Sequence, residues 1–228
     1  MRKALKIVSI ILLALVIGAF IAFQIMDEAL PKGLEGEKAE RLADKMLKSV
    51  NKRAWDSLEI ISWSYMPDHN YTWYKRQDSV IVNWDDYTVY LNTKTIKGKA
   101  KSTASIAEGD TTDIIQRAYE YFINDSFWLG AQFKVRDSGT KRGIVDYKGK
   151  EALLVTYTSG GVTPGDSYLW ILDEDYRPKA WKFWVAKIPV GGIEFSWEGW
   201  ENINEAKISS FHNGPFNINI ELSNVKGH

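Results

Sequence analysis

The sequence predicts an α+β protein built on one large antiparallel sheet. Short segments in which every second residue is large and apolar recur along the chain, as in Ile193-Glu194-Phe195-Ser196-Trp197. This period of two is typical of a strand with one buried face, because successive side chains point to opposite sides of a sheet. Beyond the N-terminus, only two stretches have a helical period, and they stand apart from the strands instead of alternating with them. That arrangement indicates an antiparallel sheet with separate helices.

Two amphipathic helices are expected. The first covers residues 37–51, and its apolar residues are spaced to form one face, which consists of Ala39, Leu42, Ala43, Met46, Leu47 and Val50. The second begins near Asp110, with Asp110 or Thr111 as its cap, and its apolar stripe consists of Ile114, Ile115, Ala118, Tyr119 and Phe122. Each helix has a single apolar face, which predicts that both pack against the sheet.

The expected strands follow one another with turn-forming residues between them. They cover residues 58–66, 71–76, 79–84, 87–93, 142–147, 151–158, 167–172, 179–185, 193–200, 206–212 and 216–223. The longest break among the later strands is the loop 159–166, which contains Gly160-Gly161 and Pro164-Gly165.

The N-terminus predicts a membrane anchor. Arg2, Lys3 and Lys6 precede an apolar stretch from Ile7 to Ile25. A helix of this length spans about 28 Å, close to the ~30 Å hydrocarbon core of a bilayer. The basic flank predicts a cytoplasmic N-terminus, with the rest of the chain outside. We therefore interpret 1–25 as a single-pass inner-membrane anchor, 26–36 as a linker and 37–228 as a periplasmic domain. A cleaved signal peptide and a buried soluble helix are the alternatives.

Composition excludes several classes of protein. Lysine and arginine together number 29, as do aspartate and glutamate, so the net charge is zero. This balance provides no attraction to a polyanion, which argues against nucleic acid as a partner. Cysteine is absent, which excludes disulfides, thiolate zinc sites, cysteine nucleophiles and a lipidated N-terminal cysteine.

Aromatic residues are the strongest functional signal. They make up 13% of the chain and include ten tryptophans. Because they fall on the apolar side of their strands, many are expected to converge on one inner wall. Two interpretations remain open: the rings form only a core against the helices, or they line an apolar ligand cavity. The candidate ligand-binding residues are Trp63, Trp84, Trp170, Trp181, Phe183, Phe195 and Trp197.

Three segments resemble a known family: Asn124–Leu129, Thr158–Trp170, and the pair Trp181–Trp184 with Ser196–Glu198. They are similar to uncharacterised membrane-anchored proteins from Bacteroidota-type bacteria, whose architecture looks like that of the LolA/LppX-like lipoprotein carriers. The resemblance covers nearly the whole chain. It implies a strongly curved antiparallel sheet, an unclosed β-barrel, with about two helices on its concave face. It also implies that acyl chains or other apolar ligands are held between sheet and helices.

Other motifs have simpler explanations. Ser49-Val50-Asn51-Lys52 matches S-x-x-K without the partner motifs of penicillin-recognising enzymes. Gly160-Gly161 lacks the features of a phosphate-binding loop, and Asp166 is the carboxylate beside it. His69 with Asp68 is expected to be an exposed turn pair, and no histidine has the spacing of a metal ligand. Three glutamates lie near tryptophans, and paired carboxylates beside tryptophan also serve glycosidases; they are Glu194, Glu198 and Glu201. Glu194 and Glu198 fall on the polar side of their strand, which favours solvated outer-face residues.

The sequence therefore predicts a membrane-anchored periplasmic domain that binds a hydrophobic ligand such as lipid or the acyl chains of a lipoprotein. Neither a catalytic residue, a metal nor a cofactor is expected. An envelope scaffold with a protein partner and no ligand is the alternative. An envelope glycan hydrolase that uses Glu198 or Asp166 is a third hypothesis.

Overall fold

The computed structural model describes residues 27–104, 110–159 and 164–228. Within these ranges, no helix is both long and apolar enough to cross a bilayer. The anchor that the sequence predicts at 7–25 lies outside the described residues.

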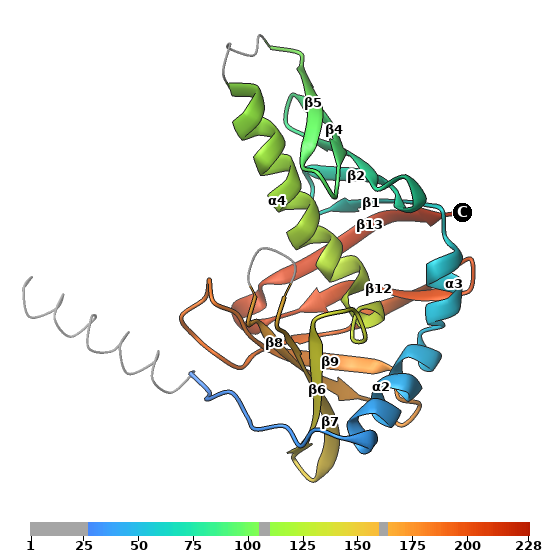
Figure 1. Cartoon of the computed structure of the whole chain (residues 1–228), viewed down its shortest axis with the longest axis vertical. Coiled ribbons are helices and arrows are strands. Elements are labelled where there is room, and N and C mark those ends of the chain that lie inside the picture. The colour runs from blue at the N-terminus through green and yellow to red at the C-terminus, as the bar shows by residue number, and fades with distance from the viewer. Residues whose placement is uncertain (1–26, 105–109, 160–163) are drawn as a thin grey trace, which may run out of the picture.

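Two antiparallel sheets form the frame of the molecule (Figure 1). The larger sheet has the order β11-β12-β13-β1-β2-β3-β4-β5, and the smaller has the order β10-β9-β8-β7-β6. The strands of the larger sheet are β1 Ile60–Tyr65, β2 His69–Tyr74, β3 Ser79–Trp84, β4 Tyr87–Asn92, β5 Lys97–Ser102, β11 Glu198–Ile203, β12 Ala206–Asn213 and β13 Asn219–Gly227. Those of the smaller sheet are β6 Thr140–Tyr147, β7 Lys150–Tyr157, β8 Ser167–Leu172, β9 Pro178–Trp184 and β10 Ile193–Ser196.

The two sheets meet at Trp197, the single residue between β10 and β11. Its backbone N–H donates to Lys179 O of β9 at 2.8 Å, while Ser196 O accepts from the His212 ring of β12 at 3.0 Å. The strand expected over 193–200 is therefore divided in two, and Gly199, with φ of 61°, supplies the bend. β5 and β6, at opposite ends of this arrangement, do not pair with each other. The predicted unclosed antiparallel α+β architecture is confirmed, but the strands form two sheets and not the one large sheet that the sequence predicts, because the chain bends between β10 and β11.

Three helices lie against the sheets: α2 Glu37–Ser49, α3 Lys52–Ser57 and α4 Asp110–Gly130. The predicted apolar face of α2 is buried on the smaller sheet, except for Val50, which follows the end of the helix and packs in the core over the larger sheet. The long helix α4 runs across the larger sheet and ends beside the smaller one (Figure 1). The short helix α3 and strand β5 were not expected. β5 contains three lysines and no large apolar residue, so it gives no strand pattern, and its backbone pairing with β4 forms it.

The segment 27–36, expected as a linker, is bonded to the smaller sheet. Leu34 and Ile144 exchange two backbone hydrogen bonds of 2.9 Å, and Glu28 N donates to Gly191 O at 3.1 Å. The ammonium of Lys182, a buried residue of β9, contacts both carboxylate oxygens of Glu28 at 2.5 and 2.6 Å. We call residues 27–36 the strap, because they tie the start of the domain to the outer face of the smaller sheet.

We predict that the strap depends on the neutralisation of Lys182. Glu28→Gln leaves the buried ammonium without a counter-charge and should destabilise the domain by about 1–2 kcal/mol. In a Lys182→Met background the same change should cost much less, because there is no charge to neutralise. A double-mutant cycle from urea unfolding of the full chain in mild detergent measures this coupling. Equal costs in both backgrounds would show that the ion pair does not hold the strap.

Candidate functional site

The structure buries all seven predicted ligand-binding residues, each at most 6% exposed, but divides them between two clusters. Trp63 and Trp84 belong to the cluster over the larger sheet. Trp63 stacks on Tyr71 of β2, with ring centroids 4.6 Å apart. The other five, Trp170, Trp181, Phe183, Phe195 and Trp197, lie together in the cluster over the smaller sheet.

Three of these five rings form a tryptophan triad. Trp170, Trp181 and Trp197 lie with centroids 5.0 Å apart in each of the three pairs. They come from β8, β9 and the β10–β11 junction, so the curvature of the smaller sheet brings them together. Cross-strand pairing sets Trp170 opposite Trp181. The triad is the centre of the candidate site.

Helix α4 covers the triad with two rings that were not among the predicted site residues. Trp128 lies 5.1 Å from Trp181 and 5.0 Å from Phe195, between ring centroids. Phe127 stacks on Trp181 at 5.7 Å. The signal was present in the sequence as an apolar trio, 127–129, but the expected stripe of the helix stopped at Phe122. Because α4 continues to Gly130, this trio belongs to the helix and packs onto the sheet.

The indole N–H groups of the triad are buried without a hydrogen-bond acceptor among the described residues. The same is true of Trp63 Nε1. An indole nitrogen can only donate, and a buried donor without a partner costs about 1–3 kcal/mol. Phenylalanine would fill similar space without that cost. The three N–H groups thus give this apolar interior a capacity to bind a hydrogen-bond acceptor.

A second buried polar group joins α4 to the larger sheet. The carboxylate of Asp125, 2% exposed, accepts from Tyr71 Oη at 2.5 Å and from Asn124 Nδ2 at 2.9 Å. His69 Nδ1 lies 2.7 Å from the same carboxylate. The expected exposed pair of His69 with Asp68 is therefore wrong, since the histidine of β2 turns inward to a helix far along the chain. Burial raises the pKa of Asp125, and the hydrogen bonds from Tyr71, His69 and Asn124 oppose this rise.

His212 lies against the triad. Its ring centroid is 4.5 Å from that of Trp197 and 5.2 Å from that of Trp128. The side chain is fully buried. Burial lowers the pKa of His212 to about 4, against the opposing effect of backbone hydrogen bonds with Ser196 and Trp128. The imidazole is therefore neutral at physiological pH and forms part of the interior.

The remaining sequence candidates lie apart from this interior. Ser49 Oγ donates to Met46 O at 2.7 Å within α2. Asp166 accepts from Ala186 N at 2.9 Å, while Gly160 and Gly161 lie outside the described residues. No group of three or more histidine, aspartate or glutamate side chains suited to a metal ion occurs in the described part of the chain. The glutamates near tryptophan are exposed, as predicted; they are Glu194, Glu198 and Glu201.

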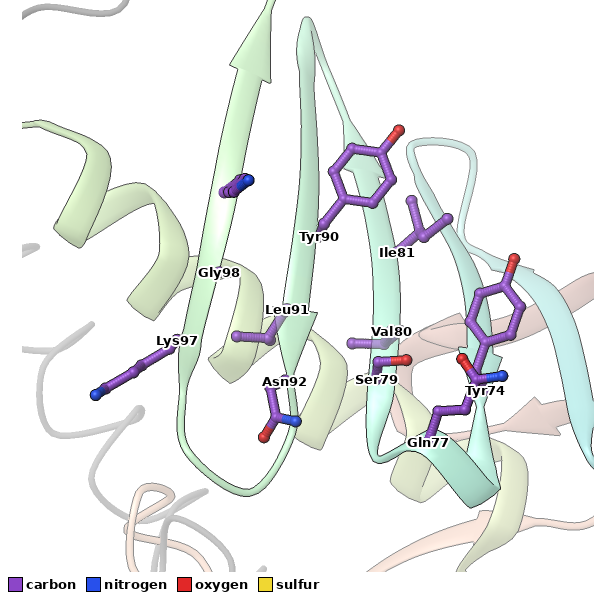
Figure 2. Close-up of a pocket in the computed structure, with 11 residues that line it drawn as sticks. Tyr74, Gln77, Ser79, Val80, Ile81, Tyr90, Leu91, Asn92, Lys97 and Gly98 are labelled. Atoms are coloured by element: carbon purple, nitrogen blue, oxygen red, sulfur yellow. The ribbon is translucent and has the colours of Figure 1, made fainter.

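An open groove with a volume of about 620 Å³ lies on the outer face of β2–β5, and Figure 2 shows the residues that line it. Tyr74, Ile81 and Tyr90 line it, with Gly98 of β5 at one side. A smaller hollow of about 400 Å³ lies between the β4–β5 turn and the first turns of α4. Neither is lined by any of the seven predicted aromatic residues, so these surface hollows are separate from the triad.

We predict that His212 sensitises the fold to acid. The unfolded chain binds a proton near pH 6.5 and the folded chain only near pH 4, so stability is complete above pH 6.5 and falls toward pH 4. The loss should amount to about 3 kcal/mol. His212→Gln should flatten this acid limb in urea unfolding followed by tryptophan fluorescence. His228→Gln, which removes an exposed histidine, is the control. An unchanged acid limb in His212→Gln would contradict the prediction.

We predict the opposite trend for Asp125. Its raised pKa means that the folded state holds the proton more tightly than the unfolded chain does. The stability it contributes is present at low pH and is lost as pH rises through the folded pKa. The stability of Asp125→Asn relative to the native chain should therefore increase from pH 4 upward and then level off. Asp113→Asn, at an exposed position on the same helix, is the matched control. A difference that does not vary with pH would refute the prediction.

Comparison with known proteins finds only distant structural similarity. No family model matches the chain, and no curated protein matches it. Among solved structures, a LolA superfamily protein from Nitrosomonas europaea is 11% identical, with a TM-score of 0.39, over 81% of this chain and 92% of that one. A DUF1329 family protein from Desulfovibrio piger is 10% identical, also with a TM-score of 0.39, over 84% of this chain and 94% of the other. At these values neither structure indicates what this chain binds.

Proposed function

We propose that this chain is a membrane-anchored periplasmic domain that binds a hydrophobic ligand, a lipid or the acyl chains of a lipoprotein. In this proposal, residues 1–25 hold the chain in the inner membrane, and the ligand lies between the smaller sheet and the end of α4. Membership of the Bacteroidota-type membrane-anchored family is part of the same proposal and rests on the sequence resemblance alone.

The unpartnered indoles of the triad are the observation that carries the proposal. A core that serves stability alone is filled by residues without polar atoms, and buried indoles normally reach an acceptor. Here Trp170, Trp181 and Trp197 each bury an N–H that has no acceptor in the part of the chain that the structure describes. A ligand with an apolar body and a carbonyl or carboxylate oxygen would fit the site, because the body matches the apolar interior and the oxygen accepts from the indole N–H groups. Binding requires movement of Phe127 and Trp128, because these two rings cover the triad.

The proposal needs no covalent chemistry. The hydrolase hypothesis gains no support, because Glu198 is exposed while the aromatic rings are buried. The scaffold hypothesis is favoured by a different observation: the triad is at most 2% exposed and is covered by α4. A domain with a permanently closed interior would act through its surface and a protein partner.

We expect a photoreactive fatty acid to reach the interior. Membranes that contain the full chain are incubated with a diazirine-bearing palmitate and irradiated, and the labelled peptides are identified by mass spectrometry. Labels should appear on β8, β9 and the end of α4, in addition to any on residues 1–25. Labels confined to the N-terminal segment or to the outer surface would contradict the ligand proposal and favour the scaffold.

Matched substitutions test the role of the N–H groups. Trp181→Phe and Trp197→Phe keep an aromatic ring and remove a donor, so interior labelling should fall about tenfold for a loss of about 1.4 kcal/mol. Trp55→Phe is the control, because Trp55 is also buried but belongs to the other cluster, where it stacks on Phe133 at 4.5 Å. An equal fall in all three variants would indicate a general loosening of the fold.

A further inference from the structure

The connection between β12 and β13 is a short, ordered tip that exposes two apolar side chains. Phe216 is 77% and Ile218 is 52% exposed. Two backbone hydrogen bonds close the tip, from Gly214 N to Ile218 O at 2.9 Å and from Ile218 N to Pro215 O at 3.1 Å. Phe216 and Asn217 both have positive φ, 57° and 59°. A bulky residue is seldom found in this left-handed region, so the tip holds its phenylalanine outward at a conformational cost.

The tip is fixed to the body of the molecule. A Cβ atom on Gly214 would lie 2.3 Å from the ring of Phe195, so only glycine allows this close approach to the buried ring. Asn213 N also donates to Ser196 Oγ at 2.9 Å. Both contacts are with β10, so the position of the tip follows from the position of that strand.

Strand register places the tip beside Asp27, the first residue that the structure describes. β12 is antiparallel to β11, with Phe211 opposite Glu198 and Asn213 beside Ser196. Beyond Asn213 the chain therefore continues along β10 toward Gly192. There the strap begins: Gly191 N donates to Asp27 Oδ1 at 2.8 Å, and Glu28 N donates to Gly191 O at 3.1 Å.

The loop 185–192 adds a third apolar side chain to this edge. Ile188, 39% exposed, lies three residues before Gly191, to which Asp27 and Glu28 bind. We call Ile188, Phe216 and Ile218, together with the backbone that carries them, the apolar rim. The apolar stretch from Ile7 to Ile25 ends two residues before Asp27. In the sequence, only residue 26 lies between this stretch and Asp27, which begins the strap and is bonded to Gly191 of the loop 185–192.

We propose that the apolar rim lies in the surface of the lipid bilayer, with Phe216 and Ile218 at the boundary between headgroups and acyl chains. This inference rests on the anchoring part of the proposed function. Side chains of this type insert at that depth, and the anchor keeps them at a high effective concentration next to lipid. The result is a fixed orientation of the domain, with the β12–β13 tip toward the membrane.

Fluorescence quenching tests the orientation directly. Because the chain has no cysteine, Phe216→Cys, Ile188→Cys and Ile96→Cys each give a single site for a bimane label. The full-length variants are placed in phosphatidylcholine vesicles with or without brominated acyl chains. We expect brominated lipid to reduce the emission at positions 216 and 188 at least twofold. Ile96 should be unaffected.

Ile96 is a suitable control because it is 37% exposed but lies at the opposite strand ends. Ile96 is bonded to Asn92, and cross-strand pairing runs from Asn92 to Ser79, then to Tyr74 and then to Ile60. Ile60 is bonded to His228, which follows the end of β13, whereas the tip precedes the start of β13. Absence of quenching at 216 and 188, or equal quenching at all three positions, would overturn the proposal. Absence of quenching together with protection of 216 from a water-soluble quencher would point to a protein on the rim and would overturn it equally.

A second variant tests whether the bimane label itself draws the domain to the membrane, because it keeps the label at one position and changes only the tip. With bimane at position 188, the additional changes Phe216→Ser and Ile218→Ser should remove more than half of the quenching if the tip holds the rim at the membrane. Unchanged quenching would overturn the role of the tip. Sedimentation with the vesicles after alkaline extraction reports on the anchor separately. A chain that sediments but shows no quenching refutes the rim proposal alone, and one that does not sediment refutes the anchor.

Discussion

The packing of α4 against both sheets is the interaction on which the rest of the structure depends. Ala118, Phe122 and Leu129 bury themselves in the cluster over the larger sheet, while Trp128 packs against both clusters. The hydrogen bonds between the two sheets lie around Trp197, and a shared element covers the inner faces of both. A single helix of 21 residues is long enough to do so, and the curvature of the sheets makes room for it.

The buried polar groups of the interior differ in their hydrogen bonding. Asp125 is surrounded by donors from β2 and from its own helix, so it fixes the position of α4 on the larger sheet as well as filling space. Within residues 27–104, 110–159 and 164–228, the indoles of Trp170, Trp181 and Trp197 have no such partners. On the larger sheet, α4 is therefore held by the hydrogen bonds of Asp125. Over the triad, the end of the helix is held by the ring contacts of Phe127 and Trp128 and by one hydrogen bond between the backbone of Trp128 and His212. Movement over the triad costs fewer directional bonds than movement over Asp125.

The same edge of the molecule gathers three features that are far apart in the sequence: the start of the strap, the loop 185–192 and the β12–β13 tip. Strand register and hydrogen bonds of the backbone, two of them to the side chains of Asp27 and Ser196, bring these features together. Phe195 lies in the same aromatic cluster as the triad, and its ring packs against Gly214 of the tip. A membrane seated on the rim would therefore lie next to the wall that holds the triad, which connects the two proposals through one buried ring.

The sequence by itself determined the class of fold, most strand positions and the apolar faces of α2 and α4, because these follow from local periodicity. It also identified the aromatic residues that would be buried, since each lies on the apolar side of its strand. Only the tertiary structure decided which of them meet. It separated Trp63 and Trp84 from the triad and brought Trp128 and His69 inward. Periodicity gives the side of an element that faces inward, whereas curvature, register and long-range pairing determine what that side touches.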